Sequence, residues 1–488
     1  MSLPGIPSHS HVNFKPNLYS ILSNLVQRQP QQVYLYGDDG PLTYQQVDNI
    51  ASKLGQALQR EIDPQRPLLG ISLSSNTAVL QLVWACLASG ICLAFLPAIS
   101  DSEQVAALMA QIGVELLITD VPELQQRPWA MAFTDLQQTV AAHDNDGVVT
   151  AVEPTTPAFL FQTSGTTGAA KWIQVTHGQF AAAIESMREM GCLDHAAAQT
   201  VYITPPLSHS YGLSSLLEYS AMGAAVVLPA AESTLGAVGD LLQGRYNEVI
   251  TAVEGVPHFY AQMTRLLRRI KLPHLRHVGF GGGALDLAAV QQLQAVYPAL
   301  SYSVRYGLTE TPSVVSHKLF TPPYSENWHS SGKVLPIYTL RIVDEGGNSL
   351  PAGQVGEIHL QGVSLAWPYY GETAVTPFFA TGDVGYMDAD TQELHINGRQ
   401  SAFLKVRGYR LSPDYLESII GLCPGVAECR VSGTETGILA EVVPANAALL
   451  PQTVLTFLAD KLPSYAIPET IHFVDMIPRT HSGKIKRH

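Results

Sequence analysis

The sequence predicts an α/β fold, in which a large N-terminal part built on mostly parallel strands precedes a smaller α+β unit. The length of 488 residues is enough for roughly three domain-sized units. Short apolar strands alternate with helical segments from residue 68 to about residue 305, which implies a parallel sheet with helices on its faces. From about residue 335 the pattern changes to short antiparallel strands and turns, and past Arg399 it changes again to a compact α+β unit.

The first half of the chain supplies the clearest alternation. Residues 17–60 look helical in two pieces, because apolar side chains recur at three- and four-residue spacing and Thr43 with Gln46 can form a capping box. Thr176 with Gln179 predicts a second capping box, for a helix that ends near residue 190. The other predicted elements are strands at 68–73, 91–96, 115–119, 158–161 and 172–175, and helices at 76–89 and 102–112.

The second half continues the pattern and then departs from it. Asn397-Gly398 is typical of a two-residue hairpin turn, and Ser412-Pro413 is typical of a helix start. The predicted strands are 201–204, 224–228, 249–253, 278–280, 301–305, 339–343, 357–361, 402–406, 427–431 and 438–443. The predicted helices begin at 213 and after 283, or span 235–243, 258–270, 413–420 and 454–462, and a basic tail follows.

Composition excludes several classes of protein. Hydrophobic residues make up 46% and charged residues 14% of the chain, which favours large cores over disorder. The net charge of −13 disfavours a nucleic-acid-binding surface. The five cysteines contain no CxxC pair, and the first 16 residues lack a basic region followed by an apolar run, so we expect a reduced, cytoplasmic protein. No apolar run approaches about 20 residues, so we expect no membrane span.

The first chemical motif runs from Phe161 to Lys171, and we expect it to be a loop between two strands. Glycines let a backbone approach a ligand closely, and hydroxyls, backbone N–H groups and a lysine suit a polyanion such as a triphosphate. The common P-loop spacing GxxxxGK[ST] is absent. The alternative is a flexible surface turn. The candidate phosphate-binding residues are Thr163, Ser164, Gly165, Thr166, Thr167, Gly168 and Lys171.

Two further motifs follow predicted strands or turns. In residues 306–311, Tyr306 can stack on a flat base, Thr309 can bond a phosphate or carboxylate, and Glu310 can hold Mg²⁺. In Thr381-Gly382-Asp383, a carboxylate after a glycine turn suits the two hydroxyls of a ribose. The alternatives are an ordinary exit from a strand for the first motif and a capped β-turn for the second.

The last two motifs lie near the end of the chain. Asn397-Gly398-Arg399 leads to the basic stretch 405–410, and residues 479–484 place Lys484 on a Ser-Gly segment from which a lysine can reach far. The alternative for the second motif is a solvated basic tail.

These five stretches in series resemble the adenylate-forming superfamily, which includes acyl- and aryl-CoA ligases, peptide-synthetase adenylation domains and luciferase-like enzymes. The resemblance extends from Leu42 to Lys484. It implies a large domain, residues 1–399, of stacked, mostly parallel sheets with helices and a small β-barrel-like subdomain. It also implies a small mobile α+β domain, residues 400–488, that rotates between two half-reactions.

The resemblance implies a role for each motif. Thr163 to Gly168 with Lys171 would wrap the β- and γ-phosphates of ATP, and Lys484 would bridge the substrate carboxylate and the α-phosphate. The remaining roles would be adenine binding by Gly282, Gly283 and Tyr306, α-phosphate binding by Thr309, Mg²⁺ binding by Glu310, and ribose binding by Asp383 with Arg399 nearby. One departure is that Gln400-Ser401-Ala402 follows Arg399, so the expected hinge carries less charge than is common in the family.

The resemblance also points to a substrate class. Amino-acid-activating relatives usually place an aspartate where this chain has Ser208-His209, so we expect a non-amino acid, aromatic or medium acyl, with His209 near its carboxylate; a structural role for His209 is the alternative. The stretch 405–410 favours a phosphopantetheine thiol on a separate acyl or peptidyl carrier protein over CoA, and only four residues follow Lys484. CoA ligases, amino-acid-adenylating domains, NTP-hydrolysing modules and luciferase-type oxygenases remain alternatives.

Overall fold

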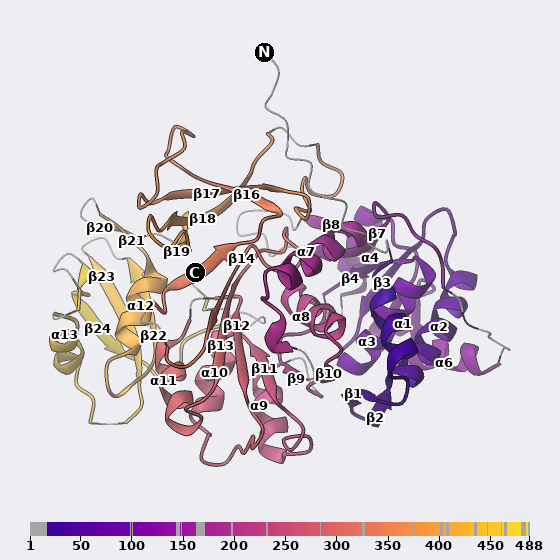
Figure 1. Cartoon of the computed structure of the whole chain (residues 1–488), viewed down its shortest axis with the longest axis horizontal. Coiled ribbons are helices and arrows are strands. Elements are labelled where there is room, and N and C mark those ends of the chain that lie inside the picture. Colours follow the sequence, from indigo (N-terminus) through magenta and orange to yellow (C-terminus); the bar gives the residue numbers. More distant parts are fainter. Residues whose placement is uncertain are drawn as a thin grey trace.

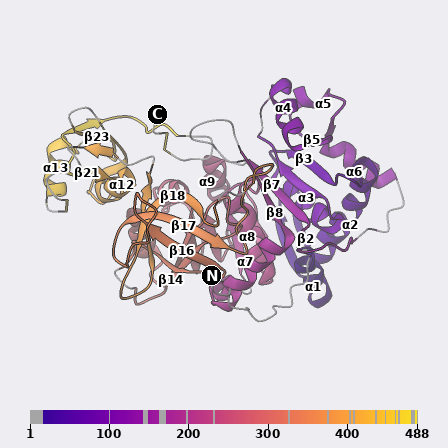
Figure 2. The same ribbon diagram turned by 90° about the horizontal axis from the view of Figure 1, so that it is seen from above.

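The computed structural model describes residues 17–488 except 98, 100, 143–146, 148, 163–170, 197–198, 231–232, 284, 325–326, 374–375, 401–403, 407–408, 434–436, 447, 460, 463–465, 480–484 and 487–488. Two sheets and a separate C-terminal unit organise this part of the chain (Figure 1). The six-stranded sheet and the C-terminal unit lie at opposite ends of the molecule, and the larger sheet lies between them (Figure 2).

The six-stranded sheet is parallel except at one edge. Its last two strands, β7 and β8, pair antiparallel and flank residues 163–170, as the sequence predicts. The strand order is β6 (Ala130–Ala132), β5 (Leu117–Thr119), β3 (Leu68–Ser72), β4 (Cys92–Phe95), β7 (Pro157–Gln162) and β8 (Trp172–Thr176).

The larger sheet has 13 strands and changes character along its width. The neighbours β1, β10, β9, β11, β12 and β13 are parallel, and the strands beyond β13 pair antiparallel. The order is β16 (Tyr338–Val343), β17 (Gly356–Gly362), β18 (Phe379–Met387), β19 (Leu394–Arg399), β15 (Ser330–Val334), β14 (Ser316–Phe320), β13 (Ser301–Tyr306), β12 (His277–Gly281), β11 (Ala252–Gly255), β9 (Thr200–Ile203), β10 (Ala225–Val227), β1 (Val33–Gly37) and β2 (Gly40–Thr43).

Helices cover both sheets. Thr43 and Thr176 form the two predicted capping boxes with Gln46 and Gln179, so α2 and α7 begin where the sequence predicts. Helix α3 is buried almost throughout, as its continuous apolar sequence requires. The helices of this part are α1 (Ser20–Arg28), α2 (Tyr44–Glu61), α3 (Asn76–Ser89), α4 (Ser102–Ile112), α5 (Pro122–Gln125), α6 (Phe133–Ala142), α7 (His177–Glu189), α8 (Ser210–Ala221), α9 (Thr234–Gln243), α10 (Pro257–Thr264) and α11 (Leu287–Val296).

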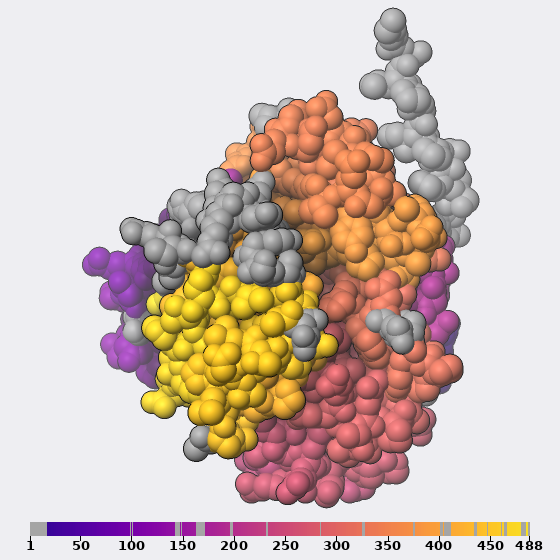
Figure 3. Space-filling model, turned by 90° about the vertical axis from the view of Figure 1, so that its left-hand side faces the viewer, coloured from indigo at the N-terminus to yellow at the C-terminus, as the bar shows by residue number. Residues whose placement is uncertain are grey.

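The C-terminal unit has its own apolar core, formed by buried residues between Leu411 and Ile471. Ser412 caps α12 with Pro413 at its first position, which confirms the predicted helix start. The unit consists of β20 (Leu404–Val406), β21 (Tyr409–Leu411), α12 (Pro413–Gly421), β22 (Val426–Gly433), β23 (Ile438–Pro444), α13 (Pro451–Ala459) and β24 (Thr470–Phe473). Figure 3 shows it seated against the larger part of the molecule.

The structure corrects three predictions and contains several elements that were not predicted. Residues 33–43 form the hairpin β1–β2 between two helices, a hairpin that the aromatic strand residues and the turn at Asp38-Asp39-Gly40 could have revealed. Asn397-Gly398 is no hairpin turn: Val384 pairs with Gly398 and Gly385 with Ile396, so the sequence forms a bulge inside β19. Helix α10 ends at Thr264 rather than near residue 270. The elements that were not predicted are strands β6, β14, β15, β18, β19, β21 and β24 and helices α5 and α6.

No helix among the described residues is both long enough and apolar enough to cross a membrane.

Candidate active site

The candidate site lies at the carboxyl ends of the parallel strands β9, β11, β12 and β13. These strands run in register, so their ends at Ile203, Gly255, Gly281 and Tyr306 lie along one edge of the sheet. In open α/β sheets this edge is where ligands bind.

Lys171 and Glu310 belong to one connected polar cluster, although 139 positions separate them in the sequence. The Nζ atom of Lys171 lies 3.1 Å from Oε1 of Glu372 and 4.4 Å from the ring centre of Tyr369. The hydroxyl of Tyr369 donates a hydrogen bond of 2.9 Å to Oε1 of Glu310. The structure therefore brings together two of the residues that the sequence singled out, through two that it did not.

Tyr306, Asp383 and Arg399 form a second connected cluster. The Tyr306 hydroxyl donates a 2.8 Å hydrogen bond to Oδ2 of Asp383, and Nε of Arg399 lies 2.9 Å from Oδ1 of the same carboxylate. The Asp383 side chain is buried whereas that of Arg399 is half exposed. Burial and the neighbouring carboxylate raise the pKa of the Tyr306 phenol well above its ordinary value, so Tyr306 stays a neutral donor.

Asp383 lies within a strand, whereas the sequence predicts that it follows a glycine turn. Thr381-Gly382-Asp383 lies within strand β18, and Asp383 pairs directly with Arg399 of β19. Gly382 has a φ of +72°, a left-handed conformation that side-chain-bearing residues rarely adopt.

The segment from Gly281 to Gly283 packs tightly against neighbouring loops. A Cβ atom on Gly281 would lie 2.7 Å from Cζ of Tyr211, and one on Gly283 would lie 3.3 Å from Cγ of Pro257. Gly282 has a φ of +74°. The glycines are therefore required for a turn that packs against both α8 and the start of α10.

Of the remaining predicted site residues, the structure describes Thr309 and His209. Thr309 lies in the turn after β13, next to Glu310. His209 is exposed at the residue before α8, at the same edge of the sheet. Thr163, Ser164, Gly165, Thr166, Thr167, Gly168, Ser401 and Lys484 lie outside the described residues.

A buried charge network beneath this edge was missed by the sequence reasoning. The guanidinium of Arg305 forms an ion pair with Glu218 of α8, and its Nη1 atom lies 3.5 Å from Oε2 of Glu254 of β11. Tyr211 and Tyr219 donate hydrogen bonds of 2.7 and 2.9 Å to the two oxygens of Glu254. A glutamate inside an apolar helix and another inside an apolar strand were the available signals.

Three histidines lie beside this network. The rings of His195 and His277 stack with centres 3.7 Å apart, and His317 lies next to them. Ligand atoms of His195, His277 and Glu254 lie within 4.8 Å of one another, a spacing that a metal ion could use. However, His277 shares its two ring nitrogens with the hydroxyls of Ser301 and Ser303, and the Glu254 oxygens accept from tyrosines. The side chains of His277 and Glu254 therefore have hydrogen-bond partners without a metal.

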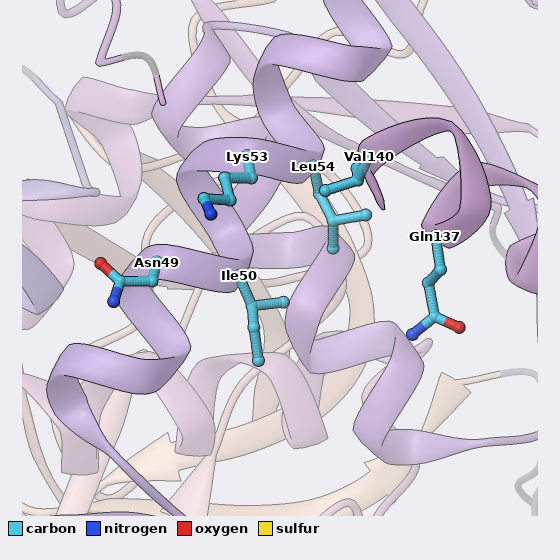
Figure 4. A pocket seen from close by; sticks show the side chains of 6 residues that line it. All are labelled: Asn49, Ile50, Lys53, Leu54, Gln137 and Val140. Atoms are coloured by element: carbon cyan, nitrogen blue, oxygen red, sulfur yellow. The ribbon is translucent and has the colours of Figure 1, made fainter. Parts of the chain in front are cut away.

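A cavity of about 270 Å³ lies elsewhere, between α2 and α6 (Figure 4). Its lining is mostly apolar, and its only ionisable side chain is Lys53. None of the motif residues lines it, so it plays no part in the site. The lining residues are Asn49, Ile50, Lys53, Leu54, Gln137 and Val140.

Known proteins resemble this chain over most of its length. A family model for AMP-binding enzymes matches residues 22–370, and one for the C-terminal domain of AMP-binding enzymes matches residues 415–484. A 2-succinylbenzoate–CoA ligase of Bacillus licheniformis is 25% identical over 479 residues, covering 94% of this chain and 96% of that protein.

Two further relatives cover nearly the whole chain. The fatty acid–[acyl-carrier-protein] ligase ScoC of Streptomyces coeruleorubidus is 27% identical over 497 residues, covering 94% of this chain and 93% of that protein. The solved structure of the anthranilate CoA ligase AuaEII with anthranoyl-AMP has the same fold, with a TM-score of 0.85 at 21% identity, covering 96% of this chain and 95% of that one. The chain therefore belongs to the AMP-binding enzyme family and is an adenylate-forming enzyme of the ligase class.

Proposed function

We propose that this enzyme activates a non-amino carboxylic acid, aromatic or medium acyl, with ATP, and then transfers the acyl group to a phosphopantetheine thiol of a separate carrier protein. The observation that carries the adenylation step is the convergence of three sequence-distant motif segments at one sheet edge. Lys171 and Glu310 meet through Tyr369, and Tyr306 and Asp383 meet directly. One cluster offers charge for phosphates, and the other offers an aromatic ring and a carboxylate for a nucleoside.

Nucleotide binding follows from these two clusters. Asp383 would accept from the ribose hydroxyls, with Tyr306 and Arg399 fixing its carboxylate. Tyr306, Gly282 and Gly283 would bind adenine, since the turn leaves a backbone surface against which a flat ring can lie. Residues 163–168 with Lys171 would bind the β- and γ-phosphates, and Thr309 the α-phosphate. Lys171 is half exposed and therefore accessible to a phosphate.

The chemistry needs positioning more than a covalent nucleophile. An oxygen of the substrate carboxylate bonds to the α-phosphorus of ATP, and the bond from that phosphorus to the bridging oxygen breaks. Pyrophosphate leaves with the electron pair. Carboxylate and triphosphate repel each other, so cations and alignment supply most of the rate. We assign the positive charge on the leaving phosphates to Lys171. We assign the bridging of the substrate carboxylate and the α-phosphate to Lys484.

The residues near Glu310 fit a magnesium ion. Mg²⁺ prefers oxygen ligands and is commonly held by one or two carboxylates together with substrate phosphates. The Glu310 carboxylate accepts from the hydroxyl of Tyr369, and Lys171 over the ring of Tyr369 marks where phosphates would lie. When bound, the ion would supply charge neutralisation, and Glu310 would hold it.

In the second step the thiol loses its proton to solvent and its sulfur bonds to the acyl carbonyl carbon; the bond from that carbon to the phosphate oxygen of AMP breaks, and AMP leaves with the electron pair. CoA and a carrier protein present the same phosphopantetheine thiol, so either can serve this chemistry. The basic stretch 405–410 favours the carrier protein. Relatives of both kinds exist, since one is named a CoA ligase and another an acyl-carrier-protein ligase. CoA as the acceptor is the second candidate.

ATP–pyrophosphate exchange across a panel of carboxylic acids tests the first step. We expect exchange only when a suitable non-amino acid is present. Preference for an α-amino acid would refute the substrate class, and ATP hydrolysis without an acid would indicate an NTP-hydrolysing module. Oxygen consumption after adenylation would indicate an oxygenase. Supplying CoA and carrier proteins to the preformed acyl-AMP complex then identifies the acceptor.

The division into domains 1–399 and 400–488 is part of the same proposal. Limited proteolysis tests it, because a hinge at Gln400 and Ser401 predicts early cleavage near these residues and an intact fragment that begins there. If the segment around Gln400 and Ser401 resists the protease, the proposed hinge is wrong.

A further inference from the structure

Strand β22 of the C-terminal unit contacts two other parts of the chain. One is helix α10 together with Arg265, the residue that follows it, and the other is the C-terminal end of the chain. Along this strand Cys429 and Val431 are buried in the unit's core, so Glu428 and Arg430 lie on the opposite face. This face carries a glutamate and an arginine two residues apart, and each has partners on a different element.

Glu428 contacts helix α10 of the large unit. Nε2 of Gln262 donates a 3.0 Å hydrogen bond to Oε1 of Glu428, and Nη2 of Arg265 lies 3.4 Å from the same oxygen. Arg265 also donates a 2.8 Å hydrogen bond to the carbonyl of Ala427. The Glu428 side chain is largely buried in this contact, at 12% exposed.

The same face of β22 holds the end of the chain. Nη2 of Arg479 lies 3.4 Å from Oε2 of Glu428, and Nη1 of Arg430 donates a 2.8 Å hydrogen bond to the carbonyl of Lys486. Arg479 and Ile485 form an antiparallel bridge, and the amide of Lys486 donates a 2.8 Å hydrogen bond to the carbonyl of Pro478. In the sequence, Lys484 lies between Arg479 and Ile485, outside the described residues.

We propose that Glu428 is a positioning residue for adenylation, which holds the base of the Lys484 segment against helix α10. The proposal rests on the function proposed above, in which Lys484 acts at the α-phosphate. One oxygen of the carboxylate takes the donors of α10 and the other takes Arg479, so a single side chain joins the two elements.

Helix α10 is a suitable anchor because it begins at the candidate nucleotide site. Pro257, its first residue, packs against Gly283. His258 follows, with Arg479, Glu428 and Arg265 as its charged neighbours. Burial together with Arg479 lowers the pKa of His258 to about 4, so the imidazole is neutral near pH 7 and leaves Glu428 as the partner of Arg479. Helix α10 therefore packs against the proposed adenine-binding turn at its start and, through Glu428, positions Arg479 near the end of the chain.

The test separates the two half-reactions in the full-length enzyme. We expect Glu428→Gln to lower kcat for acid-dependent ATP–pyrophosphate exchange by about tenfold to a hundredfold, with KM for ATP within about twofold, since misplacing a reacting group costs this much. Transfer of the acyl group from supplied acyl-AMP to a thiol stays unchanged or rises. We expect Arg479→Gln to have the same effect, and the double variant to be no worse than either single one. Glu428→Asp, which keeps the charge, recovers part of the rate.

Glu185→Gln is the matched control, because it breaks an ion pair with Arg188 on α7, away from both contacts. We expect it to leave both half-reactions unchanged. If Lys484→Ala abolishes exchange while Glu428→Gln does not lower it, positioning by Glu428 is wrong and the proposed function stands. Equal losses of both half-reactions, or additive losses in the double variant, also overturn the positioning role. Undiminished exchange in Lys484→Ala overturns the role of the lysine itself.

Discussion

Two groups of charged residues lie at the same end of the large sheet, and they differ in burial. Arg305, Glu218 and Glu254 lie beneath the strand ends with side chains no more than 4% exposed. Above them, Lys171, Glu372 and Arg399 keep about half of their side-chain surface, at 49–52% exposed. Arg305 and Tyr306 are neighbours on β13, and Tyr306 contacts Asp383, the partner of Arg399. Adjacent strand residues point to opposite faces, so one strand reaches both groups.

The difference separates structure from binding. A buried charge that loses its partner keeps its full desolvation penalty, so the members of the buried group fix one another. An exposed pair contributes little to stability and can exchange its partner for a ligand. We therefore expect substitutions below the strand ends to change folding, and substitutions above them to change nucleotide binding.

The largest effect is expected for Arg305→Met. It leaves Glu218 and Glu254 buried without a counter-charge, and we expect the free energy of unfolding to fall by about 3–5 kcal/mol. Urea denaturation measures this. Lys171→Met, which breaks the exposed ion pair with Glu372, is the matched control from the exposed group, with an expected loss of less than about 1 kcal/mol. Similar losses in the two variants would remove the distinction between the groups.

Asp383→Asn is expected to act on binding. The change keeps the shape of the side chain but weakens charged hydrogen bonds that are worth about 1.5–3 kcal/mol, so KM for ATP should rise about tenfold or more. Kinetics of pyrophosphate exchange measures it, together with the urea midpoint. A loss of stability as large as that of Arg305→Met, with KM unchanged, would assign Asp383 to the structural group.

Acid should destabilise the fold in part through His195, which lies beside the buried group. Burial lowers the pKa of His195 to about 4, from an ordinary value of 6.5. The unfolded chain therefore binds a proton between pH 6.5 and pH 4 that the folded chain does not, so stability is full above pH 6.5 and falls as the pH drops. The expected slope is about 1.4 kcal/mol per pH unit for this histidine. We expect the slope of the unfolding free energy against pH to be smaller in His195→Gln than in the unchanged protein. An equal slope in the two proteins would show that His195 does not cause this pH dependence.

The smallest effect is expected for Glu372→Gln. Glu372 neutralises Lys171 through an exposed ion pair, so removing its charge should lower KM for ATP slightly, by a factor that corresponds to about 0.2–1 kcal/mol. The effect should shrink as salt is added, because exposed charges are screened. Lys171→Met should change KM in the opposite direction. If Glu372→Gln and Lys171→Met both raise KM for ATP by the same factor, Glu372 contributes to ATP binding rather than competing with ATP for Lys171.

Much of the fold could be predicted from local sequence. Capping at Thr43, Thr176 and Ser412 gave correct helix starts, since a capping residue acts within one turn of its helix. The hairpin β1–β2 was missed, because its strands contain apolar residues that also fit a helical spacing. The Asn397-Gly398 prediction failed because pairing of β18 with β19 outweighs the local turn preference.

The sequence by itself determined the motif residues and the order of the elements, because each depends on residue types at short spacing. Only the tertiary structure decided which of these residues meet: that Tyr306 lies on Asp383, that Tyr369 lies between Lys171 and Glu310, and that Arg305 lies between two glutamates. These contacts join residues 51 to 198 positions apart in the sequence, or depend on which face of a strand a residue occupies. Local spacing carries no information about either, because both are set by sheet order and strand register.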